Sequence, residues 1–340
     1  MGSDSVHFYN PNAVNPYAFE LAAVVAGERI RTVVWATRDN ASATPSGVSV
    51  HRVLAAERHR ARNVVETVLH RLFGPVRAVI GARTNVLVVC WVKDPWDAWV
   101  MRARARMIGR TVAVYHNPHQ IRGVTSTTKH ELALLRASTS VVHTERLADV
   151  ARTDLPNVRV AMHPPYANLV RFARPNRVAT SLTTDSPLAY VGALRTDKGA
   201  HLLPRIAEST TKPWAVRFIG AGRVPDQLIH DLEARGVRVE NREEEYRPPD
   251  ELLVRSLQEC RGLIAPYVSV TVSGTIVLAD TIGLPVLTFS ETLTDREAIV
   301  DTLAKQIDEL ANHKRDARAT GVDEWSARAS NQWRTIIKEA

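Results

Sequence analysis

Two cationic side chains follow a short apolar strand in the second half of the chain. In segment 190–199, Gly192 ends the strand, and the loop that follows presents Arg195 and Lys198. Glycine lets a ligand approach the backbone closely, and a forked guanidinium beside a mobile ammonium suits an anion with several oxygens. The pattern predicts a diphosphate site at this loop, although solvated cations on a surface loop would give the same sequence.

A second anion site is predicted where a later strand turns into a helix. Pro266 and Tyr267 follow the strand, and Ser273, Gly274 and Thr275 then open the helix. Serine is a fitting N-cap, and glycine leaves the first helical amides uncovered. Free N–H groups at a helix N-terminus bind anions without any side-chain charge. A plain connection between a strand and a helix remains the alternative.

The elements that must position these residues alternate along the whole chain. Strands are predicted at residues 32–36, 78–80, 86–92, 111–115, 140–143, 188–192, 215–219, 237–240, 262–265 and 285–289. Helices are predicted at residues 16–26, 51–73, 94–108, 129–137, 199–208, 226–235, 250–259, 274–282 and 296–311. Such alternation gives parallel sheets covered by helices, which bind ligands beyond the carboxyl ends of their strands.

A stretch rich in proline, asparagine and arginine, residues 162–176, divides the two series of strands. The sequence therefore predicts an α/β protein with two doubly wound, Rossmann-like domains that face each other across a cleft. We place the first domain at residues 1–170 and the second at 171–323. Residues 324–340 are predicted to form a helix that packs back on the first domain.

Composition excludes several classes of protein. The chain has 340 residues, of which 45% are hydrophobic and 24% charged, so it can bury a large core and is neither disordered nor a coiled coil. Its two cysteines exclude a disulfide framework and a cysteine-rich zinc site. We find no spacing typical of metal ligands and expect no metal and no cofactor. The longest apolar run, residues 86–92, is far shorter than a membrane span, and we expect a cytoplasmic protein.

Positive charge is concentrated in the first half. Residues 1–170 contain 21 Lys/Arg and 12 Asp/Glu, and many of these arginines lie in segments 51–73, with Arg58, Arg60 and Arg62, and 99–110. An anionic membrane surface or a lipid-linked substrate would explain this charge, as would a solvated arginine-rich face. Nucleic acid is not favoured as a partner, because the chain has no helix-turn-helix, zinc-finger or RNP-type pattern.

The two anion motifs, taken in order, resemble the donor domain of GT-B fold glycosyltransferases. The chain has the Gly-x-Leu-Arg-x-x-Lys-Gly loop and, after it, Pro-Tyr, Ser-Gly and Gly-x-Pro-Val at residues 266–286. Residues 115–120, Tyr-His-Asn-Pro-His-Gln, are similar to a strand-end segment of the same group. The pattern is most similar to the family-4-like sugar transferases of bacterial exopolysaccharide and glycolipid assembly. The resemblance implies transfer of a hexose, without a metal, from a UDP- or GDP-sugar to a hydroxyl of a glycan or lipid-linked acceptor, by an enzyme that is cytoplasmic or peripheral at the inner face of the membrane.

The resemblance also implies roles for particular residues. Arg195 and Lys198 would be catalytic and neutralise the diphosphate as the sugar–phosphate bond breaks. His116 would hydrogen-bond a sugar hydroxyl or act as a base on the acceptor hydroxyl. The donor-binding residues would be Gly192, Arg195, Lys198, Gly222, Tyr246, Pro266, Tyr267, Ser273, Gly274 and Thr275. The acceptor-side residues would be Asn12, Asn15, His116 and His119, and Asn15 fits equally well as the N-cap of the first helix.

Departures from the family pattern keep two other functions open. Ala193 stands where many members have arginine, and Leu278 stands where a glutamate normally binds the sugar or ribose. These losses leave the stereochemical outcome open and allow a catalytically silent nucleotide-sugar-binding or scaffold subunit. A GT-B fold nucleotide-sugar epimerase is the third alternative, although the missing glutamate counts against it.

Overall fold

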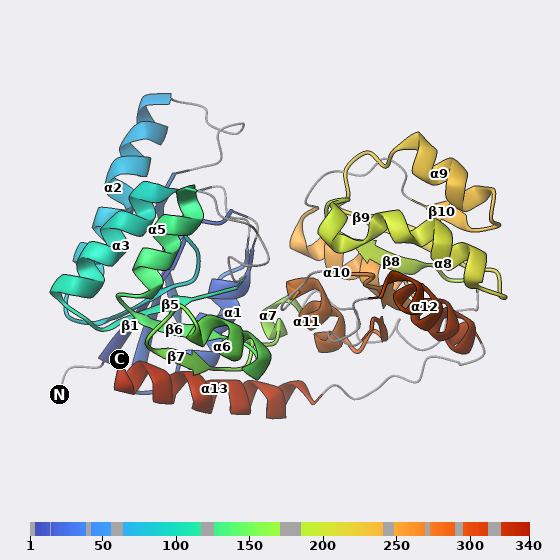
Figure 1. Cartoon of the computed structure of the whole chain (residues 1–340). Coiled ribbons are helices and arrows are strands. Elements are labelled where there is room, and N and C mark those ends of the chain that lie inside the picture. The colour runs from blue at the N-terminus through green and yellow to red at the C-terminus, as the bar shows by residue number, and fades with distance from the viewer. Residues whose placement is uncertain are drawn as a thin grey trace. The chain divides into compact units, whose positions relative to one another are not determined.

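The computed structural model describes residues 4–13, 15–38, 42–55, 64–116, 126–170, 185–240, 248–268, 273–289, 295–311 and 321–340. The chain divides into two compact units (Figure 1). Unit 1 comprises Met1–Asn168 and Val322–Ala340, and unit 2 comprises Leu169–Gly321. Each unit has a parallel sheet with its own hydrophobic core, so the predicted α/β class with two Rossmann-like domains is confirmed. The roles that we assign to the two domains stay predictions.

Unit 1 is built on a parallel sheet with the strand order β3-β2-β1-β4-β5-β6-β7. Its strands are β1 (Asp4–Asn10), β2 (Ile30–Thr37), β3 (Val48–Leu54), β4 (Val86–Val89), β5 (Thr111–Val114), β6 (Thr139–Val142) and β7 (Val158–Val160). Its helices are α1 (Tyr17–Val25), α2 (Val64–Ala82), α3 (Pro95–Met107), α5 (Ser126–Leu135), α6 (Glu145–Arg152) and α13 (Val322–Glu339), and the short α7 (Ala167–Val170) lies at the junction of the units.

Helices cover both faces of this sheet. α2, α3 and α5 lie side by side on one face, and α1 packs against α13 on the other (Figure 1). The last helix, α13, joins the core of unit 1 through Trp333, which is fully buried and donates its indole N–H to the Met162 carbonyl at 3.0 Å. Arg334 of the same helix donates to the Val25 carbonyl at the end of α1. The C-terminal helix thus completes the first unit.

Unit 2 has a five-stranded parallel sheet in the order β10-β9-β8-β11-β12. Its strands are β8 (Leu188–Val191), β9 (Ala215–Ile219), β10 (Arg238–Glu240), β11 (Gly262–Ile264) and β12 (Val286–Leu287). Two 3₁₀ turns, η2 (Thr196–Lys198) and η3 (Ala200–Leu202), precede helix α8 (Leu203–Ser209). The other helices are α9 (Asp226–Glu233), α10 (Asp250–Gln258), α11 (Gly274–Thr281) and α12 (Arg296–Ala311).

The structure corrects several of the predicted elements of unit 1. Residues 78–80, predicted as a strand, lie inside α2, and the helix predicted over residues 51–73 is strand β3 followed by α2. The central strand β1 was not predicted, because His7 and Asn10 interrupt its apolar pattern. In the sheet His7 is buried and accepts a hydrogen bond from the Trp35 indole at 3.0 Å, which only the neighbouring strand β2 supplies. Within the described residues, no helix is long and apolar enough to cross a membrane.

Candidate functional site

The strand order of unit 2 defines one place for a ligand. From the central strand β8 the chain winds outward to β9 and β10, and then returns to β11 and β12 on the other side of β8. In a doubly wound sheet the ligand binds beyond the carboxyl ends of the strands at this reversal, between β8 and β11. The two segments that the sequence singles out, which follow β8 and β11, both begin at this edge.

A glycine of the motif allows the loops after β8 and β11 to come into contact. Gly192 and Gly199 have φ angles of 90° and 67°, which side chains other than glycine rarely adopt. A Cβ atom on Gly199 would lie 1.8 Å from the Pro266 carbonyl oxygen. The backbone of Asp197 also accepts a hydrogen bond from the Val268 amide at 3.0 Å. Gly199 therefore lets the β8 loop lie directly against the β11 loop, whereas a Cβ atom on Gly192 would lie 2.7 Å from Nζ of Lys198 in its own loop.

Lys198 is held half-buried between these loops. Its ammonium donates to the Val191 carbonyl at 3.1 Å and lies 5.3 Å from the centre of the Tyr267 ring. Burial, and next the charge of Arg195, lower the pKa of Lys198 from 10.5 to about 8, while Asp197 acts in the opposite direction. In the part of the chain that the structure describes, no carboxylate forms a hydrogen bond with this ammonium. The lysine is charged at neutral pH but poorly solvated.

Arg195 is arranged differently from Lys198. Its side chain is 61% exposed and forms a two-pronged ion pair with Asp197, with distances of 3.0 and 2.7 Å. The sequence predicts that both Arg195 and Lys198 contact the diphosphate. In the structure, Arg195 is instead paired with Asp197, a carboxylate of its own loop. The guanidinium reaches an anion at this edge only when it leaves or shares that pair.

The N-terminus of α11 lies beside the same loops. Burial raises the pKa of the Tyr267 hydroxyl, and the neighbouring Ser273 and Thr275 hydroxyls lower it. The Tyr267 side chain therefore lies near the first turn of α11, although its buried hydroxyl has no hydrogen-bond partner among the described residues. Ser273 is the N-cap residue, but its side chain makes no capping hydrogen bond to the helix, and Gly274 begins the helix. The first amides of a helix have no acceptor within it, so this turn offers N–H donors with a partial positive charge.

The remaining donor-side predictions fall at the margin of this edge or outside the described residues. Gly222 lies in the loop after β9 with a φ angle of 73°. Tyr246 lies outside the described residues, so its placement stays a prediction. Leu278, which occupies the family's glutamate position, is 3% exposed in the core of α11. A side chain at that position packs into the unit.

In unit 1, His116 follows β5 in a cluster of aromatic rings at the carboxyl end of the sheet. Its ring stacks on Trp91 with centroids 3.9 Å apart and meets the edge of Tyr17 at 4.8 Å. The Nε2 atom lies 3.0 Å from the Cys90 carbonyl. Since a carbonyl only accepts, Nε2 carries a proton and donates it to this carbonyl. The ring is thus fixed in orientation.

Two further histidines surround the same tyrosine, and the sequence did not select either as a site residue. His143 and His163 lie 4.9 Å apart and pack on Tyr17 at 5.5 and 4.9 Å between ring centres. Burial lowers the pKa of His143 to about 4 and that of His163 well below its usual value. Both rings are therefore neutral at neutral pH. The available signal was their position, one residue beyond β6 for His143 and three residues beyond β7 for His163, but only the sheet order shows that they converge.

The predicted asparagines build the loop between β1 and α1. The Asn15 side chain accepts a hydrogen bond from the Tyr17 amide at 2.9 Å, and its carbonyl accepts one from the Asn10 side chain at 3.2 Å. The amide of Asn12 donates to the Asn10 side chain at 3.2 Å. Asn15 therefore helps to position the start of α1, but the N-cap residue of that helix is Pro16 and not Asn15. His119 lies outside the described residues.

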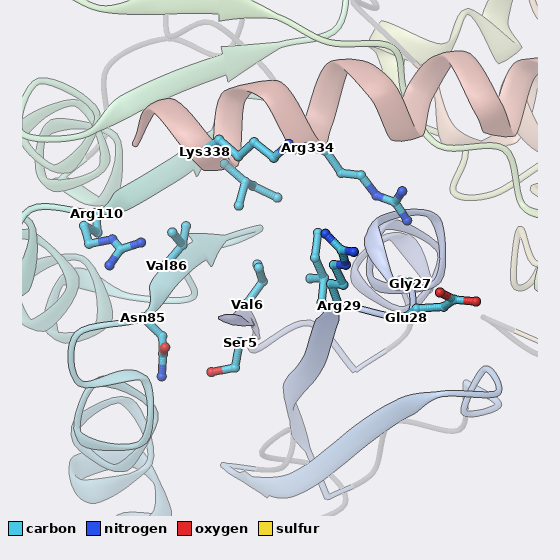
Figure 2. Close-up of a pocket in the computed structure, with 12 residues that line it drawn as sticks. Ser5, Val6, Gly27, Glu28, Arg29, Asn85, Val86, Arg110, Arg334 and Lys338 are labelled. Atoms are coloured by element: carbon cyan, nitrogen blue, oxygen red, sulfur yellow. The ribbon is translucent and has the colours of Figure 1, made fainter. Parts of the chain in front are cut away.

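The cavity in Figure 2 is a competing candidate that we set aside. It has a volume of about 770 Å³ and opens at the amino ends of β1, β2 and β4, lined by Arg29, Arg110, Arg334 and Lys338 among others (Figure 2). Two of these cations already bind backbone carbonyls, Arg110 that of Thr84 and Arg334 that of Val25. The cavity also lies at the edge opposite to the one where parallel sheets bind ligands.

We find no set of side chains among the described residues that could hold a metal ion. No three His, Cys, Asp or Glu side chains of the described residues come together as a metal site would require. The cations and helix amides at the β8/β11 edge are suited to bind an anion directly.

The comparisons with known proteins show the fold. No protein-family model matches the chain, and no curated protein matches it in sequence. Among solved structures, sucrose-phosphate synthase from Thermosynechococcus elongatus has a TM-score of 0.60 at 13% identity, covering 99% of this chain and 100% of that one. HepE from Anabaena, in complex with UDP and glucose, has a TM-score of 0.57 at 12% identity, covering 99% and 95%. A putative UDP-N-acetylglucosamine 2-epimerase from Listeria monocytogenes has a TM-score of 0.55 at 12% identity, covering 99% and 97%.

These similarities extend over nearly the whole length of both chains, while the sequence identities are low. They therefore establish architecture and leave the chemistry to the residues of this chain. The neighbours share two Rossmann-like domains, as the strand orders of units 1 and 2 also require. The chain has the GT-B fold.

Proposed function

We propose that this protein is a glycosyltransferase that binds a nucleoside diphosphate sugar at the β8/β11 edge of unit 2. It transfers a hexose to a hydroxyl group of a glycan or lipid-linked acceptor. The full-length likeness to HepE, whose structure contains UDP and glucose, supports a nucleotide-sugar donor. The reaction breaks the bond between the sugar and the diphosphate and forms a bond to the acceptor oxygen, whose proton passes to a base.

The observation that carries the proposal is the environment of Lys198. A charged ammonium is held half-buried at the predicted ligand edge, against a carbonyl and an aromatic ring, with a pKa lowered to about 8. A fold that only needed stability would gain from a neutral side chain there. A diphosphate at this edge would compensate the buried charge and raise the pKa of Lys198. Lys198 would then stabilise the charge that develops on the leaving diphosphate.

The first turn of α11 provides the second contact to the diphosphate. The amides of Ser273, Gly274 and Thr275 supply N–H donors, and the Tyr267 ring lies near both this turn and the Lys198 ammonium. Together the helix end and the ammonium neutralise the anion without a divalent cation. The proposed enzyme is therefore active in the presence of EDTA, and a strict metal requirement would contradict this assignment.

In unit 1, His116 contributes the acceptor side of the proposed reaction. Its ring is oriented by the Cys90 carbonyl contact and by stacking on Trp91. The imidazole would hydrogen-bond a hydroxyl of the acceptor or of the sugar, or take the acceptor proton. The His116→Ala variant is then expected to lose turnover and to keep its affinity for the free nucleotide.

A thermal-shift panel in EDTA tests the donor site directly. The probes are UDP, GDP, UDP-glucose and GDP-mannose, and the variants are Lys198→Met and, as a control, Lys305→Met, whose lysine is 78% exposed in the same unit. A nucleotide at 100 times its Kd raises stability by about 2.7 kcal/mol. The proposal expects stabilisation by one nucleotide family, retained in the control and lost in Lys198→Met. Equal shifts of the melting temperature in both variants would contradict the proposal that the diphosphate binds at this loop.

The fold likeness to the putative epimerase favours one second candidate function. An epimerase changes the configuration of the nucleotide sugar, whereas a transferase releases a nucleoside diphosphate. Product analysis after incubation with the stabilising nucleotide sugar separates them. Release of the nucleoside diphosphate that depends on an added acceptor supports transfer, and an isomeric nucleotide sugar supports epimerisation.

A further inference from the structure

Exposed apolar side chains are concentrated on two neighbouring helices of unit 1. Of the eleven large apolar side chains that are exposed among the described residues, ten lie between Val64 and Ile108. The remaining one, Leu252, lies alone in unit 2. Scattered apolar residues are normal on protein surfaces, but a cluster of this kind marks an interaction site.

Helix α2 presents its large apolar residues to solvent and its small ones to the protein. Its buried residues are Gly74, Pro75, Ala78 and Ala82. The first turns instead expose apolar side chains by 45–75%, namely those of Val64, Val65, Val68, Leu69, Leu72 and Phe73. In Figure 1 these first turns rise above α3 and α5. The helical spacing that would normally predict a core-facing stripe here produces a surface stripe.

Helix α3 continues this surface with a pair of stacked tryptophans. The Trp96 and Trp99 rings lie 5.2 Å apart at an angle of 16°, and Trp99 is 54% exposed. The Trp96 indole donates to the Leu72 carbonyl at 3.1 Å, which places the pair beside the α2 stripe. We call the exposed side chains of Val64, Val65, Val68, Leu69, Leu72, Phe73 and Trp99 the α2–α3 patch.

Cations accompany the patch along both helices. Residues 64–110 contain eight Lys/Arg and three Asp/Glu. Asp97 is buried, and the other two acids are paired, Glu66 with Arg38 and Asp94 with Arg71. Arg77 and Arg106 are exposed. Arg104 is buried and Arg110 lies at the amino ends of the strands, so the other cations of the two helices give the surface around the α2–α3 patch its excess of positive charge.

We propose that the α2–α3 patch docks unit 1 onto an anionic lipid bilayer. Apolar side chains enter the region between headgroups and acyl chains, tryptophan rings suit the interface, and the arginines meet the lipid phosphates. A second copy of the chain fits less well, because a two-fold contact would bring the arginines of both copies together. The expected cations Arg58, Arg60 and Arg62 lie outside the described residues, so this proposal does not use them. It also does not depend on the reaction proposed for unit 2.

Vesicle co-sedimentation of the full chain tests the proposal. The probes are vesicles of phosphatidylcholine alone and of phosphatidylcholine mixed with phosphatidylglycerol, at low and high salt. The apolar variant is Leu69→Gln with Leu72→Gln, and its matched control is Leu252→Gln, whose leucine is 46% exposed outside the patch. The charge variant is Arg77→Gln with Arg106→Gln. These side chains are solvent-exposed, and unchanged melting temperatures verify that the variants fold.

The proposal expects binding to the anionic vesicles only, weakened by salt. The apolar and the charge variants should each lower the partition coefficient by about tenfold or more, while Leu252→Gln leaves it unchanged. Absence of binding by the unmodified chain, or equal binding by all variants, overturns the proposal. Sedimentation equilibrium that shows dimers separated by the apolar variant also overturns it, because a second copy then occupies the patch.

Discussion

Replacing Lys198 by methionine should make the protein more stable and less active. The fold lowers the pKa of Lys198 from 10.5 to about 8 by burial, and one pKa unit corresponds to about 1.4 kcal/mol, so the charge costs the fold about 3 kcal/mol at neutral pH. The variant also loses the hydrogen bond to the Val191 carbonyl, worth about 1 kcal/mol. Screening by solvent reduces the charge penalty further. We expect Lys198→Met to unfold with a free energy about 1–2 kcal/mol higher than the unmodified protein.

The pH dependence of this difference identifies its cause. Because the pKa of Lys198 is lower in the folded state than in the unfolded state, the charge penalty is full below pH 8. It disappears as the pH rises towards 10.5, where the lysine is neutral in both states. Urea unfolding at pH 7 and pH 10.5 should therefore show a stability gain at the lower pH and none at the higher one.

Activity should change in the opposite direction. Loss of a charge contact to the leaving diphosphate lowers turnover of the nucleotide sugar by about 10²-fold or more. The control Lys305→Met, at an exposed position beside Glu309, should change stability by less than about 0.5 kcal/mol and leave turnover intact. The reasoning is refuted if Lys198→Met is destabilised equally at both pH values and retains turnover.

Three further predictions concern the packing of each unit. Gly199→Ala places a Cβ atom 1.8 Å from the Pro266 carbonyl oxygen at a φ angle of 67°, so unit 2 should lose more than about 2 kcal/mol, measured by urea unfolding, together with nucleotide binding. Arg104→Met removes a buried guanidinium that donates to four backbone carbonyls in two loops, and thermal unfolding should show a loss of about 3 kcal/mol or more in unit 1. The third prediction concerns unfolding by acid. Because the pKa of His143 is lowered to about 4 in the folded state, its contribution to stability is full above pH 6.5, and up to about 3 kcal/mol is lost as the pH falls through 4. Acid titration followed by circular dichroism measures this loss.

Matched variants separate these effects from general damage. Gly236 has a φ angle of 77° but nothing within 4 Å of its Cβ position, so Gly236→Ala measures the backbone strain without the collision. The exposed Arg106, two residues after Arg104, serves as the control for a lost arginine on the same helix. His143→Phe should flatten the acid limb of unit 1. An unchanged acid limb in that variant would assign the loss to other groups.

The sequence alone determined the architecture and the donor-side motifs, because both are local signals. Alternating apolar runs and helical patterns predict parallel sheets covered by helices, and the confirmed fold has this arrangement in both units. Gly192, Lys198 and Gly274 stand at strand ends and a helix start that are recognisable within a few residues. Their proposed role in binding a diphosphate stays a prediction.

Only the tertiary structure decided which distant segments meet. The contact of Gly199 with Pro266, the lowered pKa of Lys198 and the histidines around Tyr17 all depend on strands that are neighbours in the sheet but distant in sequence. An amphipathic helix has the same periodicity whether its apolar stripe is buried or exposed. Only the structure shows that the small residues of α2 are buried and that its large apolar residues are exposed. Local pattern specifies the elements, whereas burial and charge at a site are set by the neighbours that folding brings to it.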